Sequence, residues 1–356
     1  MSRALREARI GYGGYSADFR HPGDRRRFSA YAAQKDLAYE GARADGDYDL
    51  VLVTHNSDLT GWTRRKRQAG DRLKLVFELV DSYFVQRSPV RRFLKGATRY
   101  VRGPDSRLSP DFLKTLQRAC EAADAVVCST DEQRETILRY NSNVHLSFDY
   151  FGDDLGAPKQ DYSRGEKLRL VWEGQAVTLP NLTRLTGPLN ELRDRIELTV
   201  VTDPYWRRWV ISGRGTPVLE KLRDLKCPVV FHPWERETFS DRIVACDLAI
   251  IPIDRDDPMA RGKPENKLVL LWQLGMPVLT SSTPAYERAM AAAGLDLTCG
   301  DMSQWTERLE RMIAAPAGEL ERIARQGRTC ATTAYSKERF QAAFDATFES
   351  IGFDPA

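Results

Sequence analysis

Residues 250–290 read IIPIDRDDPMARGKPENKLVLLWQLGMPVLTSSTPAYERAM, and this stretch decides how the rest of the chain is interpreted. The apolar runs at 248–253 and 277–280 predict two short buried strands, separated by a charged loop at 254–261 and a helix. Pro264 suits the first turn of that helix, because its missing N–H costs nothing there. Gly275 stops the helix and Pro277 prevents its continuation. Strand, loop, helix and strand in this order predict a parallel α/β sheet.

The start of this helix is rich in cationic and amide side chains. Arg261, Lys263, Asn266 and Lys267 surround it. A helix N-terminus has free N–H groups and the positive end of the helix dipole, so it can hold an anion. We therefore expect a phosphate or diphosphate site at the carboxyl edge of the sheet. The alternative interpretation is a solvated basic helix start that binds nothing.

The composition is that of a globular α/β protein of two domains. The chain has 356 residues, of which 29% are charged and 42% hydrophobic, and this length suits two domains of ordinary size. A net charge of +3 is too small to argue for a nucleic-acid partner. The six cysteines show no metal-ligand spacing, which favours a reducing, cytoplasmic compartment. We expect no membrane-spanning segment, because no run of about eighteen apolar residues occurs.

Strands alternate with helices in two blocks, which predicts two parallel sheets, each covered by helices on both faces. The turn-rich, polar residues 152–165 read as the linker between the two blocks. The last predicted helix, at 336–351, carries Phe340, Phe344 and Phe348 four residues apart. This spacing predicts a stripe that packs into a core rather than a ligand site.

Titratable side chains follow the predicted strands of the first block. Gly13 and Gly14 end the first strand, and paired glycines let backbone N–H groups approach a ligand closely. Candidates for a general base lie at the carboxyl ends of these strands, where Asp18 and His21 rank first and His55 and Asp81 next, with Asp58 behind them. The alternative for each is a residue that only hydrogen-bonds its own loop.

Residues 86–103, QRSPVRRFLKGATRYVRG, combine six arginines or lysines with several apolar residues. Such a basic amphipathic segment suits an anionic membrane surface or a lipid-linked acceptor. The alternative is an exposed basic helix that packs its apolar face on its own domain.

The pattern KPENKL at 263–268, followed by LGMPVLTS at 274–281, resembles the donor-binding domain of GT-B glycosyltransferases. It is most similar to the bacterial transferases, glycosyltransferase family 4-like, that make surface polysaccharide or lipid-linked glycans. The resemblance implies two Rossmann-like domains with parallel sheets facing across a cleft. Residues 1–155 would bind the acceptor, with the C-terminal helix at 336–356 packing back on them, and residues 165–335 would bind the nucleotide sugar.

The resemblance implies a hexosyltransferase that moves a sugar from a UDP- or GDP-linked donor to a hydroxyl of a glycan or lipid-linked acceptor. It would be cytoplasmic, and the basic segment at 86–103 would allow it to act as a peripheral protein on the inner membrane face. The catalytic candidates are Asp18, His21, His55 and Asp81. The candidates for donor binding are Gly13, Gly14, Gly174, Trp234, Arg261, Lys263, Asn266, Lys267, Ser281 and Glu287. Lys263 is the first choice for the leaving diphosphate, and Lys267 has the alternative of pairing with Glu265 or nearby acids. Trp206 is the alternative to Trp234 for stacking on the base, and ordinary packing is the other interpretation of both tryptophans. We expect no obligatory metal, since Asp256 and Asp257 are adjacent rather than in an Asp-x-Asp triplet.

Two departures from the family pattern leave the reaction open. Gly262 and Leu270 occupy the places of the usual pair of glutamates in retaining members, and Glu173-Gly174-Gln175 stand where an arginine is common. Retaining and inverting chemistry therefore both remain possible. A sugar-nucleotide epimerase or hydrolase on the same fold, and a non-catalytic binding or scaffold protein, are the alternatives.

Overall fold

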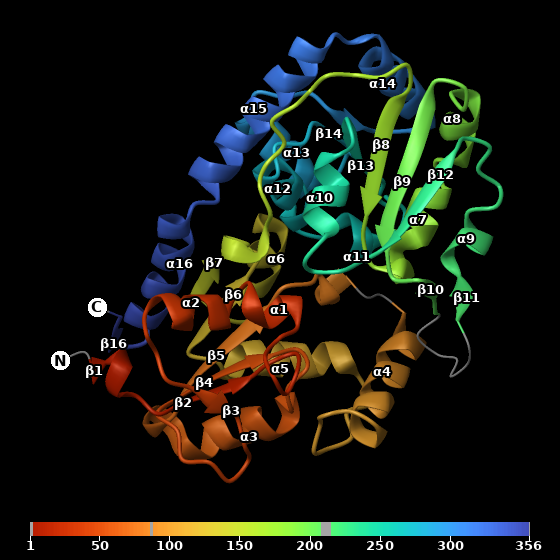
Figure 1. The fold of residues 1–356 in the computed structure, drawn as a ribbon. Helices are drawn as coiled ribbons and strands as arrows, with labels where there is room; N and C mark the ends of the chain where they lie inside the picture. Colours follow the sequence, from red (N-terminus) through yellow and green to blue (C-terminus); the bar gives the residue numbers. More distant parts are fainter. Residues whose placement is uncertain (1–2, 86–87, 208–214, 356) are drawn as a thin grey trace. The chain divides into compact units, whose positions relative to one another are not determined.

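The computed structural model describes residues 3–85, 88–207 and 215–355, except the side chain of Asp153. The chain divides into two compact units, and each is described by itself. Unit 1 comprises Met1–Tyr150, Gly262–Pro264 and Ser336–Ala356, and unit 2 comprises Phe151–Arg261 and Glu265–Tyr335. Each unit is built on one six-stranded parallel sheet with helices packed against it (Figure 1).

The sheet of unit 1 has the strand order β3-β2-β4-β5-β6-β7. Its strands are β2 (Ile10–Gly13), β3 (Glu40–Gly41), β4 (Leu50–Thr54), β5 (Lys74–Leu79), β6 (Ala125–Cys128) and β7 (Val144–Leu146). A short parallel pair, β1 (Arg3–Ala4) with β16 (Phe353–Asp354), joins the two ends of the chain. The strand order reverses at β2 and β4, so their carboxyl ends border the crevice where ligands bind in open α/β sheets.

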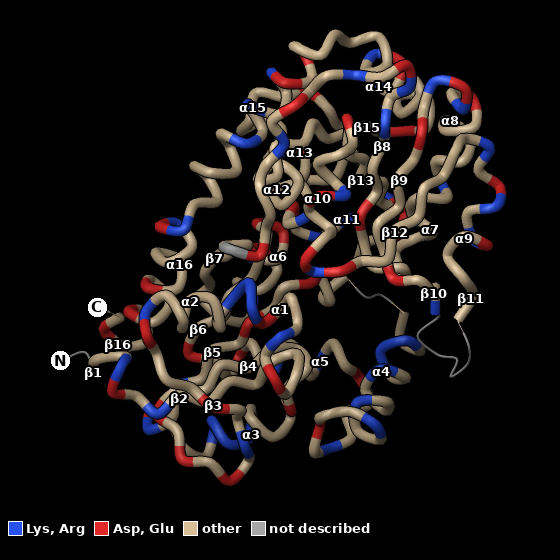
Figure 2. Tube along the Cα trace, in the orientation of Figure 1, with Lys and Arg blue, Asp and Glu red and all other residues tan. Residues whose placement is uncertain are grey.

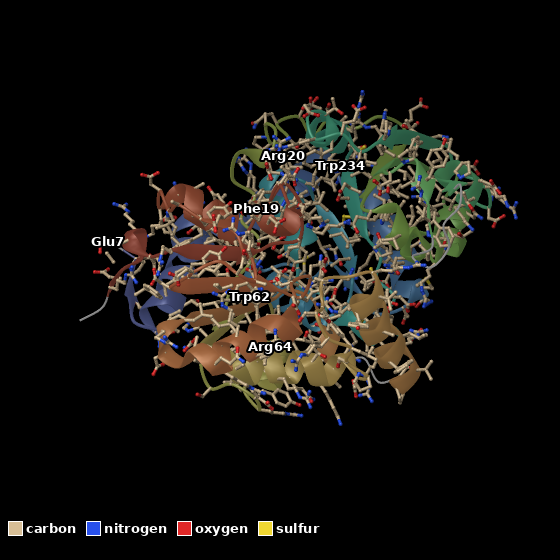
Figure 3. All side chains as sticks on the ribbon, turned by 90° about the horizontal axis from the view of Figure 1, so that it is seen from below. Glu7, Phe19, Arg20, Trp62, Arg64 and Trp234 are labelled. Atoms are coloured by element: carbon tan, nitrogen blue, oxygen red, sulfur yellow. The ribbon has the colours of Figure 1, made fainter. Side chains whose placement is uncertain are left out.

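The helices of unit 1 cover both faces of this sheet. They are α1 (Pro22–Arg25), α2 (Phe28–Gln34), α3 (Leu59–Ala69), α4 (Pro89–Val101), α5 (Phe112–Ala122), α6 (Asp131–Ile137) and α16 (Lys337–Glu349). The stripe Phe340, Phe344 and Phe348 on α16 is fully buried in the core shared with α2, which confirms its prediction as core. On α3, Trp62 is buried in the core of the other face and Arg64 is exposed (Figure 3).

The sheet of unit 2 has the strand order β12-β9-β8-β13-β14-β15. Its strands are β8 (Leu168–Glu173), β9 (Ile196–Thr202), β12 (Val229–Pro233), β13 (Leu248–Ile251), β14 (Val278–Ser281) and β15 (Thr298–Cys299), and β10 (Tyr205–Trp206) pairs antiparallel with β11 (Thr216–Pro217). The order reverses between β8 and β13, which places the ligand-binding crevice of this sheet at their carboxyl ends.

The helices of unit 2 enclose one continuous core. They are α7 (Leu179–Thr183), α8 (Thr186–Glu191), α9 (Val218–Lys221), α10 (Phe239–Val244), α11 (Pro258–Arg261), α12 (Asn266–Gln273), α13 (Pro284–Ala292), α14 (Met302–Ala314) and α15 (Ala317–Ala334). Trp272 on α12 is fully buried, and a Cβ on Gly327 of α15 would lie 2.4 Å from its ring. This glycine therefore lets α12 and α15 approach closely.

The structure corrects several predicted boundaries. The apolar spacing over 25–43 predicts one helix, but the structure has α1, α2 and β3 there, and Asp36, with a positive φ of 53°, follows the end of α2. The charged loop at 254–261 contains α11, and α12 begins at Asn266 with Glu265 as its N-cap, so Pro264 lies before the helix. Among the described residues, no helix is both long enough and apolar enough to cross a bilayer.

Candidate functional site

The crevice of unit 2 contains a lysine anchored to the end of the first strand. Lys267, in the first turn of α12, donates a hydrogen bond to the carbonyl of Glu173, the last residue of β8. Its Nζ lies 3.3 Å from Glu173 Oε2 and 5.7 Å from the centre of the Trp172 ring. The alternative that Lys267 pairs with Glu265 or another nearby acid is met by Glu173, while Glu265 accepts a hydrogen bond from Tyr335 at 2.6 Å. Lys267 therefore places a cation at the switch point between β8 and β13.

Gly174 makes room for this lysine. A Cβ at Gly174 would lie 2.6 Å from Lys267 Nζ and 3.2 Å from Thr178 Oγ1. Any side chain here would push the ammonium away from the strand end. The structure thus brings together Gly174 and Lys267, two of the predicted donor-binding residues.

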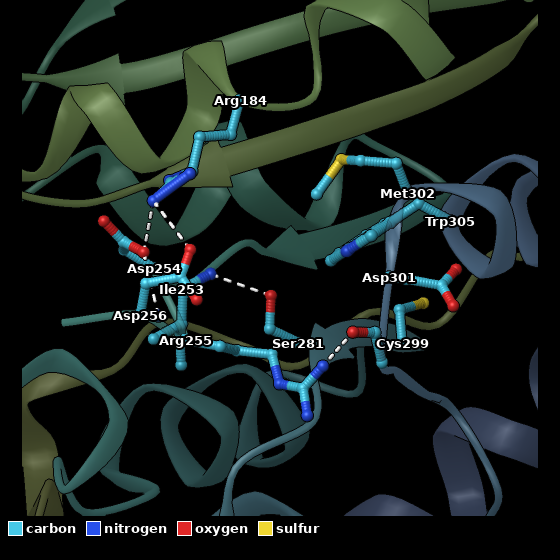
Figure 4. A pocket seen from close by; sticks show the side chains of 11 residues that line it. Arg184, Ile253, Asp254, Arg255, Asp256, Ser281, Cys299, Asp301, Met302 and Trp305 are labelled. Carbon is cyan, nitrogen blue, oxygen red and sulfur yellow. Dashed lines mark hydrogen bonds and ion pairs between the residues drawn. The ribbon is translucent and has the colours of Figure 1, made fainter. Parts of the chain in front are cut away.

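A small pocket of about 140 Å³ opens at the carboxyl ends of β13, β14 and β15 (Figure 4). The ion pair between Arg184 and Asp254 borders it, and Arg255 donates a hydrogen bond to the carbonyl of Gly300. The predicted residue Ser281 lines this pocket, where its Oγ accepts a hydrogen bond from the N–H of Ile253 at 2.9 Å. Sequence reasoning missed Arg184, because an arginine between two short helices carries no motif.

The other donor-binding candidates form few hydrogen bonds or ion pairs with described residues. Arg261 and Lys263 are exposed, and neither side chain makes a hydrogen bond or ion pair with another described residue. Asn266 is half-buried at the first position of α12. Glu287 accepts a hydrogen bond from the hydroxyl of Ser282.

The two tryptophans proposed for stacking on a base have partners of their own. Trp234, labelled in Figure 3, stacks on Phe239 with ring centres 5.2 Å apart. Trp206 lies under the Lys221 ammonium, with 4.5 Å between Nζ and the ring centre. Both pack against the core of unit 2, which is the ordinary packing role that the sequence left open.

In unit 1, a buried aspartate holds the glycine loop. Asp24 accepts hydrogen bonds from the Tyr12 hydroxyl at 2.9 Å and from the N–H groups of Tyr15 and Ser16 at 2.7 and 3.0 Å. A Cβ on Gly14 would lie 2.6 Å from Asp24 Oδ1, so the loop closes tightly around this carboxylate. Sequence reasoning missed Asp24, because nothing local marks an aspartate in a polar loop as buried.

A glycine is needed at position 13 for a similar reason, because a side chain would not fit there. Its carbonyl accepts hydrogen bonds from Thr54 Oγ1 at 2.9 Å and Ser57 Oγ at 2.7 Å, and a Cβ would lie 2.3 Å from that same Ser57 oxygen. The ends of β2 and β4 are therefore tied together at the switch point of unit 1.

His55, Tyr83 and Asp81 form a chain of contacts beside this point. The Tyr83 hydroxyl lies 2.8 Å from His55 Nε2 and donates to Asp81 Oδ2 at 3.4 Å. His55 is 8% exposed, and its Nδ1 is buried with no hydrogen-bond partner among the described residues. A buried polar atom without a partner costs about 1–3 kcal/mol of folding free energy, so such atoms are rare in folded proteins.

The charges around His55 keep it neutral. Burial, followed by the neighbouring cations Lys95 and Arg99, lowers the pKa of His55 to about 3. Lys95 lies over the Tyr83 ring with 3.7 Å between Nζ and the ring centre, and burial together with Arg99 lowers the pKa of Lys95 to about 8. Among the predicted catalytic residues, the structure brings His55 and Asp81 together, through Tyr83.

The remaining predicted bases have local roles. Asp18 is exposed and accepts a hydrogen bond from the N–H of Arg20, which lowers its pKa. His21 caps α1, because its Nδ1 accepts a hydrogen bond from the N–H of Gly23 at 3.0 Å, and burial lowers its pKa. Asp58 caps α3 in the same way. Asp18 and His21, the two residues ranked first as a general base, therefore hydrogen-bond backbone N–H groups of their own loop.

Helix α4 (Pro89–Val101) exposes its apolar face to solvent, contrary to the alternative in which this face packs on its own domain. Its apolar residues Val90, Phe93, Leu94 and Val101 are about half exposed or more. Two of its cations contact their own unit, where Arg99 forms an ion pair with Asp105 at 2.7 Å and Lys95 lies over Tyr83, while Arg91 is exposed. The interpretation that this helix packs its apolar face on its own domain is wrong, because buried partners hold the cationic face instead. Residues 86–87 of the segment lie outside the described residues.

Comparison with known proteins gives structural but not sequence relatives. No protein-family model and no curated protein matches the sequence. HepE of Anabaena, solved with UDP and glucose, superimposes with a TM-score of 0.62 at 12% identity, covering 97% of this chain and all of HepE. The UDP-forming α,α-trehalose-phosphate synthase of Burkholderia vietnamiensis gives 0.59 at 13%, covering 91% of this chain and 81% of that one.

A TarM variant of S. aureus, solved with fondaparinux, α-GlcNAc-glycerol and UDP, gives a TM-score of 0.56 at 9% identity. It covers 84% of this chain, and this chain spans only about half of TarM, 55% of its length. These proteins are GT-B glycosyltransferases. This chain has the GT-B fold.

The two switch points of this GT-B chain carry different chemistry. Unit 1 offers a neutral imidazole linked through a phenol to a carboxylate, and unit 2 offers an ammonium at the end of β8. Among the described residues, no three His, Cys, Asp or Glu side chains gather as they would around a metal ion. Each unit therefore carries its own set of polar and charged groups at the switch point of its sheet.

Proposed function

We propose that this chain is a glycosyltransferase that moves a hexosyl group from a nucleotide-diphosphate sugar to a hydroxyl of a glycan or lipid-linked acceptor. The observation that carries the proposal is the Lys267 ammonium at the switch point of unit 2, beside the N-terminus of α12. This is where an open α/β sheet binds its ligand, and a cation there suits a diphosphate. The GT-B fold of the chain supports the same assignment.

The proposed chemistry needs charge stabilisation and no metal. As the bond to the sugar breaks, negative charge develops on the leaving diphosphate. Lys267 and the free N–H groups at the start of α12 stabilise this charge, and Arg261, Lys263 and Asn266 extend the cationic and donor set. Gly174 keeps the space for the lysine, Ser281 and Glu287 contribute hydroxyl and carboxylate groups, and Trp234 is the candidate for stacking on the base.

We propose a UDP-linked donor ahead of a GDP-linked one. HepE and the TarM variant were solved with UDP, and the E. coli trehalose-6-phosphate protein among the structural neighbours was solved with UDP-2-fluoroglucose. The acceptor belongs to polysaccharide or lipid-linked glycan synthesis, and unit 1 supplies its site. There His55 and Asp81 are better placed than Asp18 and His21 to serve as a base, since the latter two shape the glycine loop.

We further propose that the protein works in the cytoplasm at the inner membrane face, through α4. An apolar helix face that includes Val90, Phe93, Leu94 and Val101 is exposed. Arg91, which is exposed, and Arg102 flank it, and Figure 2 shows α4 with blue cationic segments. An apolar face with basic flanks suits the interface of an anionic bilayer. All six cysteines are free and buried, which agrees with a reducing compartment.

A thermal-shift screen with UDP, GDP, CDP, dTDP and their sugar-linked forms tests the proposal. A ligand at a hundred times its dissociation constant stabilises the folded state by about 2.7 kcal/mol. One nucleotide sugar should shift the unfolding temperature, and Lys267→Ala should abolish that shift, with a smaller effect of Lys263→Ala. Release of free sugar without an acceptor would instead indicate a hydrolase. No shift with any nucleotide would favour a non-catalytic GT-B-like binding protein.

A further inference from the structure

We propose that α3 and α5 of unit 1 form a cationic face that lies on an anionic lipid surface, with Arg64, Arg67, Lys114 and Arg118 as its contact residues. The inference deepens the proposed function, on which it rests for the choice of a membrane as partner, because that function brings only α4 to the bilayer. Every contact used in the argument lies within unit 1.

Helices α3 and α5 cover the same face of the unit 1 sheet. Trp62 of α3 and Leu116 of α5 belong to one buried core, which they share with residues of β4 and β5. The two helices also pack directly against each other (Figure 1). Their outer sides therefore form one continuous helical layer.

The outer side of this layer carries an excess of positive charge. Arg64 and Arg67 lie three residues apart on α3, and the blue segments along α3 in Figure 2 include them. Lys114 and Arg118 lie four residues apart on α5, so each pair shares one side of its helix. All four side chains are exposed, and none forms an ion pair or hydrogen bond with another described residue. Glu121 is the one acidic residue on the two helices.

The opposite face of unit 1 does not share this excess. Helix α16 packs into the core on the other side of the sheet, and its two cations, Lys337 and Arg339, are accompanied by three acidic residues on the same helix. On α3 and α5, by contrast, like charges on neighbouring helices repel one another in the free protein. An anionic partner removes this repulsion, so the charge asymmetry favours the α3–α5 face as the one that meets an anion.

The segment between α4 and α5 favours a bilayer over a soluble polyanion as this partner. Residues 102–108 are held against the start of α3, because Asp105 Oδ1 accepts a hydrogen bond from the N–H of Leu59 at 3.1 Å. Leu108 in this segment is 55% exposed, and Val101 at the end of α4 is 74% exposed. Apolar and cationic side chains on one surface suit the interface of an anionic bilayer, whereas a soluble polyanion offers the apolar side chains no partner.

The two parts of this surface respond differently to salt. The α3–α5 face acts through charge alone, and each cation near an anionic leaflet strengthens partitioning by about fivefold. Raising the salt concentration from about 0.1 M to about 1 M shortens the Debye length from about 10 Å to about 3 Å and removes most of this attraction. The apolar residues of α4 keep their contribution at high salt, so salt separates the two contacts.

Paired substitutions in the full chain test the inference. Arg64→Gln with Arg67→Gln, and Lys114→Gln with Arg118→Gln, should each lower the partition coefficient on phosphatidylcholine vesicles containing phosphatidylglycerol. The loss should be at least about fivefold at about 0.1 M salt and nearly absent at about 1 M salt. Both variants should unfold at the temperature of the unchanged protein, since the replaced side chains face solvent.

Lys337→Gln with Arg339→Gln is the matched control, because it removes two exposed cations from the opposite face of the same unit. It should bind vesicles as the unchanged protein does. An equal loss in this control would overturn the inference, and so would vesicle binding that neither the α3 pair nor the α5 pair reduces.

Two further measurements separate the inference from its neighbours. Weaker retention of the α3 and α5 variants on dextran sulfate, with vesicle binding unchanged, would assign the face to a soluble polyanion and overturn the bilayer as its partner. A thermal shift with a nucleotide sugar, but no vesicle binding by the unchanged protein, would overturn the inference and leave the donor assignment standing. Vesicle binding that depends on both pairs, without any such shift, would support the inference and overturn the donor assignment.

Discussion

Lys267 Nζ lies 3.3 Å from Glu173 Oε2, and it also donates a hydrogen bond to the Glu173 carbonyl at the end of β8. The ammonium is thus held in place by its own unit, and under the proposed function a diphosphate would meet a cation whose position is already set. Preorganised charge of this kind contributes more than a mobile lysine, since no reorganisation accompanies binding. Glu173 is in this sense the group that orients Lys267.

Lys267→Met should weaken binding of the nucleotide diphosphate by about 10- to 100-fold, because a hydrogen bond to a charged group is worth about 1.5–3 kcal/mol. Isothermal titration with UDP measures this. Lys159→Met is the matched control in the same unit, since Lys159 also lies over an aromatic ring, that of Tyr162, and donates to a backbone carbonyl, that of Val244 before β13 begins. Equal losses in both variants would contradict the assignment of Lys267 to the donor.

The burial of His55 makes the stability of unit 1 depend on acid. The pKa of His55 is about 3 in the folded chain and 6.5 for a free histidine. Below pH 6.5 the unfolded chain therefore binds a proton that the folded chain does not, and stability falls as pH decreases toward 3. Between pH 7 and pH 5 this amounts to about 2 kcal/mol.

Chemical denaturation of the unchanged protein and of His55→Gln at pH 7 and pH 5 tests this dependence. The variant should lose about 2 kcal/mol less over this interval than the unchanged protein does. His145→Gln is the comparison, because burial also lowers the pKa of His145, and this half-exposed histidine on β7 should account for less of the acid dependence than His55. The same pH dependence in His55→Gln and in the unchanged protein would show that His55 is not the group responsible.

Lys95 should set the alkaline rise of activity. Its pKa is about 8, and its positive charge lowers the pKa of His55. As pH rises through 8, Lys95 loses its charge, His55 becomes the stronger base, and turnover should increase. Lys95→Met should show a high turnover without this rise, whereas Lys95→Arg stays charged and should remain low up to pH 9. Rate profiles between pH 6.5 and 9 distinguish them, and a rise that persists in Lys95→Met would exclude Lys95 as its source.

Asp24 should be the residue on which the shape of the glycine loop depends. Asp24→Asn turns an acceptor oxygen into an NH₂ group facing donors, and it should cost about 3 kcal/mol of unfolding free energy. Asp18→Asn is the matched control in the same loop, because Asp18 is exposed and should change stability by less than about 0.5 kcal/mol. Urea denaturation measures both, and similar values for the two variants would contradict the role of Asp24.

Hydrophobic periodicity and the alternation of strands with helices could be predicted because they depend on local patterns. The apolar runs at 248–253 and 277–280 predict β13 and β14, and the spacing of Phe340, Phe344 and Phe348 predicts a buried face. Lys267 and Gly174 could be singled out, but not their contact, since 93 residues separate them. His55 could also be singled out, but Tyr83 could not, since their pairing exists only once β4 and β5 lie side by side.

The orientation of α4 could not be predicted for a different reason. Its sequence shows an apolar face and a cationic face, and burial of the apolar face is the usual outcome. Here Arg99 finds Asp105 and two backbone carbonyls inside the unit, and Gly96 allows close approach to the Ser109 carbonyl, which a Cβ would meet at 2.0 Å. These tertiary contacts turn the cationic face inward and leave the apolar face exposed.

The exposed face of α4 predicts binding to anionic vesicles. Phosphatidylcholine vesicles containing phosphatidylglycerol should pellet the protein, and vesicles of phosphatidylcholine alone should pellet less of it. Replacing Val90, Phe93 and Leu94 by serine should lower the partition coefficient at least about tenfold, because each buried apolar side chain contributes about 1.5–3 kcal/mol when fully inserted. Arg91→Glu with Arg102→Glu should act similarly at low salt and less at high salt, since bulk ions screen exposed charges.

The control for this prediction is Leu138→Ser, because Leu138 is an exposed leucine of the same unit that lies at the end of α6, away from α4. It should leave vesicle binding unchanged. The serine variants of α4 should also unfold at the same temperature as the unchanged protein, since the replaced side chains already face solvent and contribute little to the core. Unaltered pelleting of these variants would show that α4 does not meet the membrane. Its apolar face would then have to be covered by another partner.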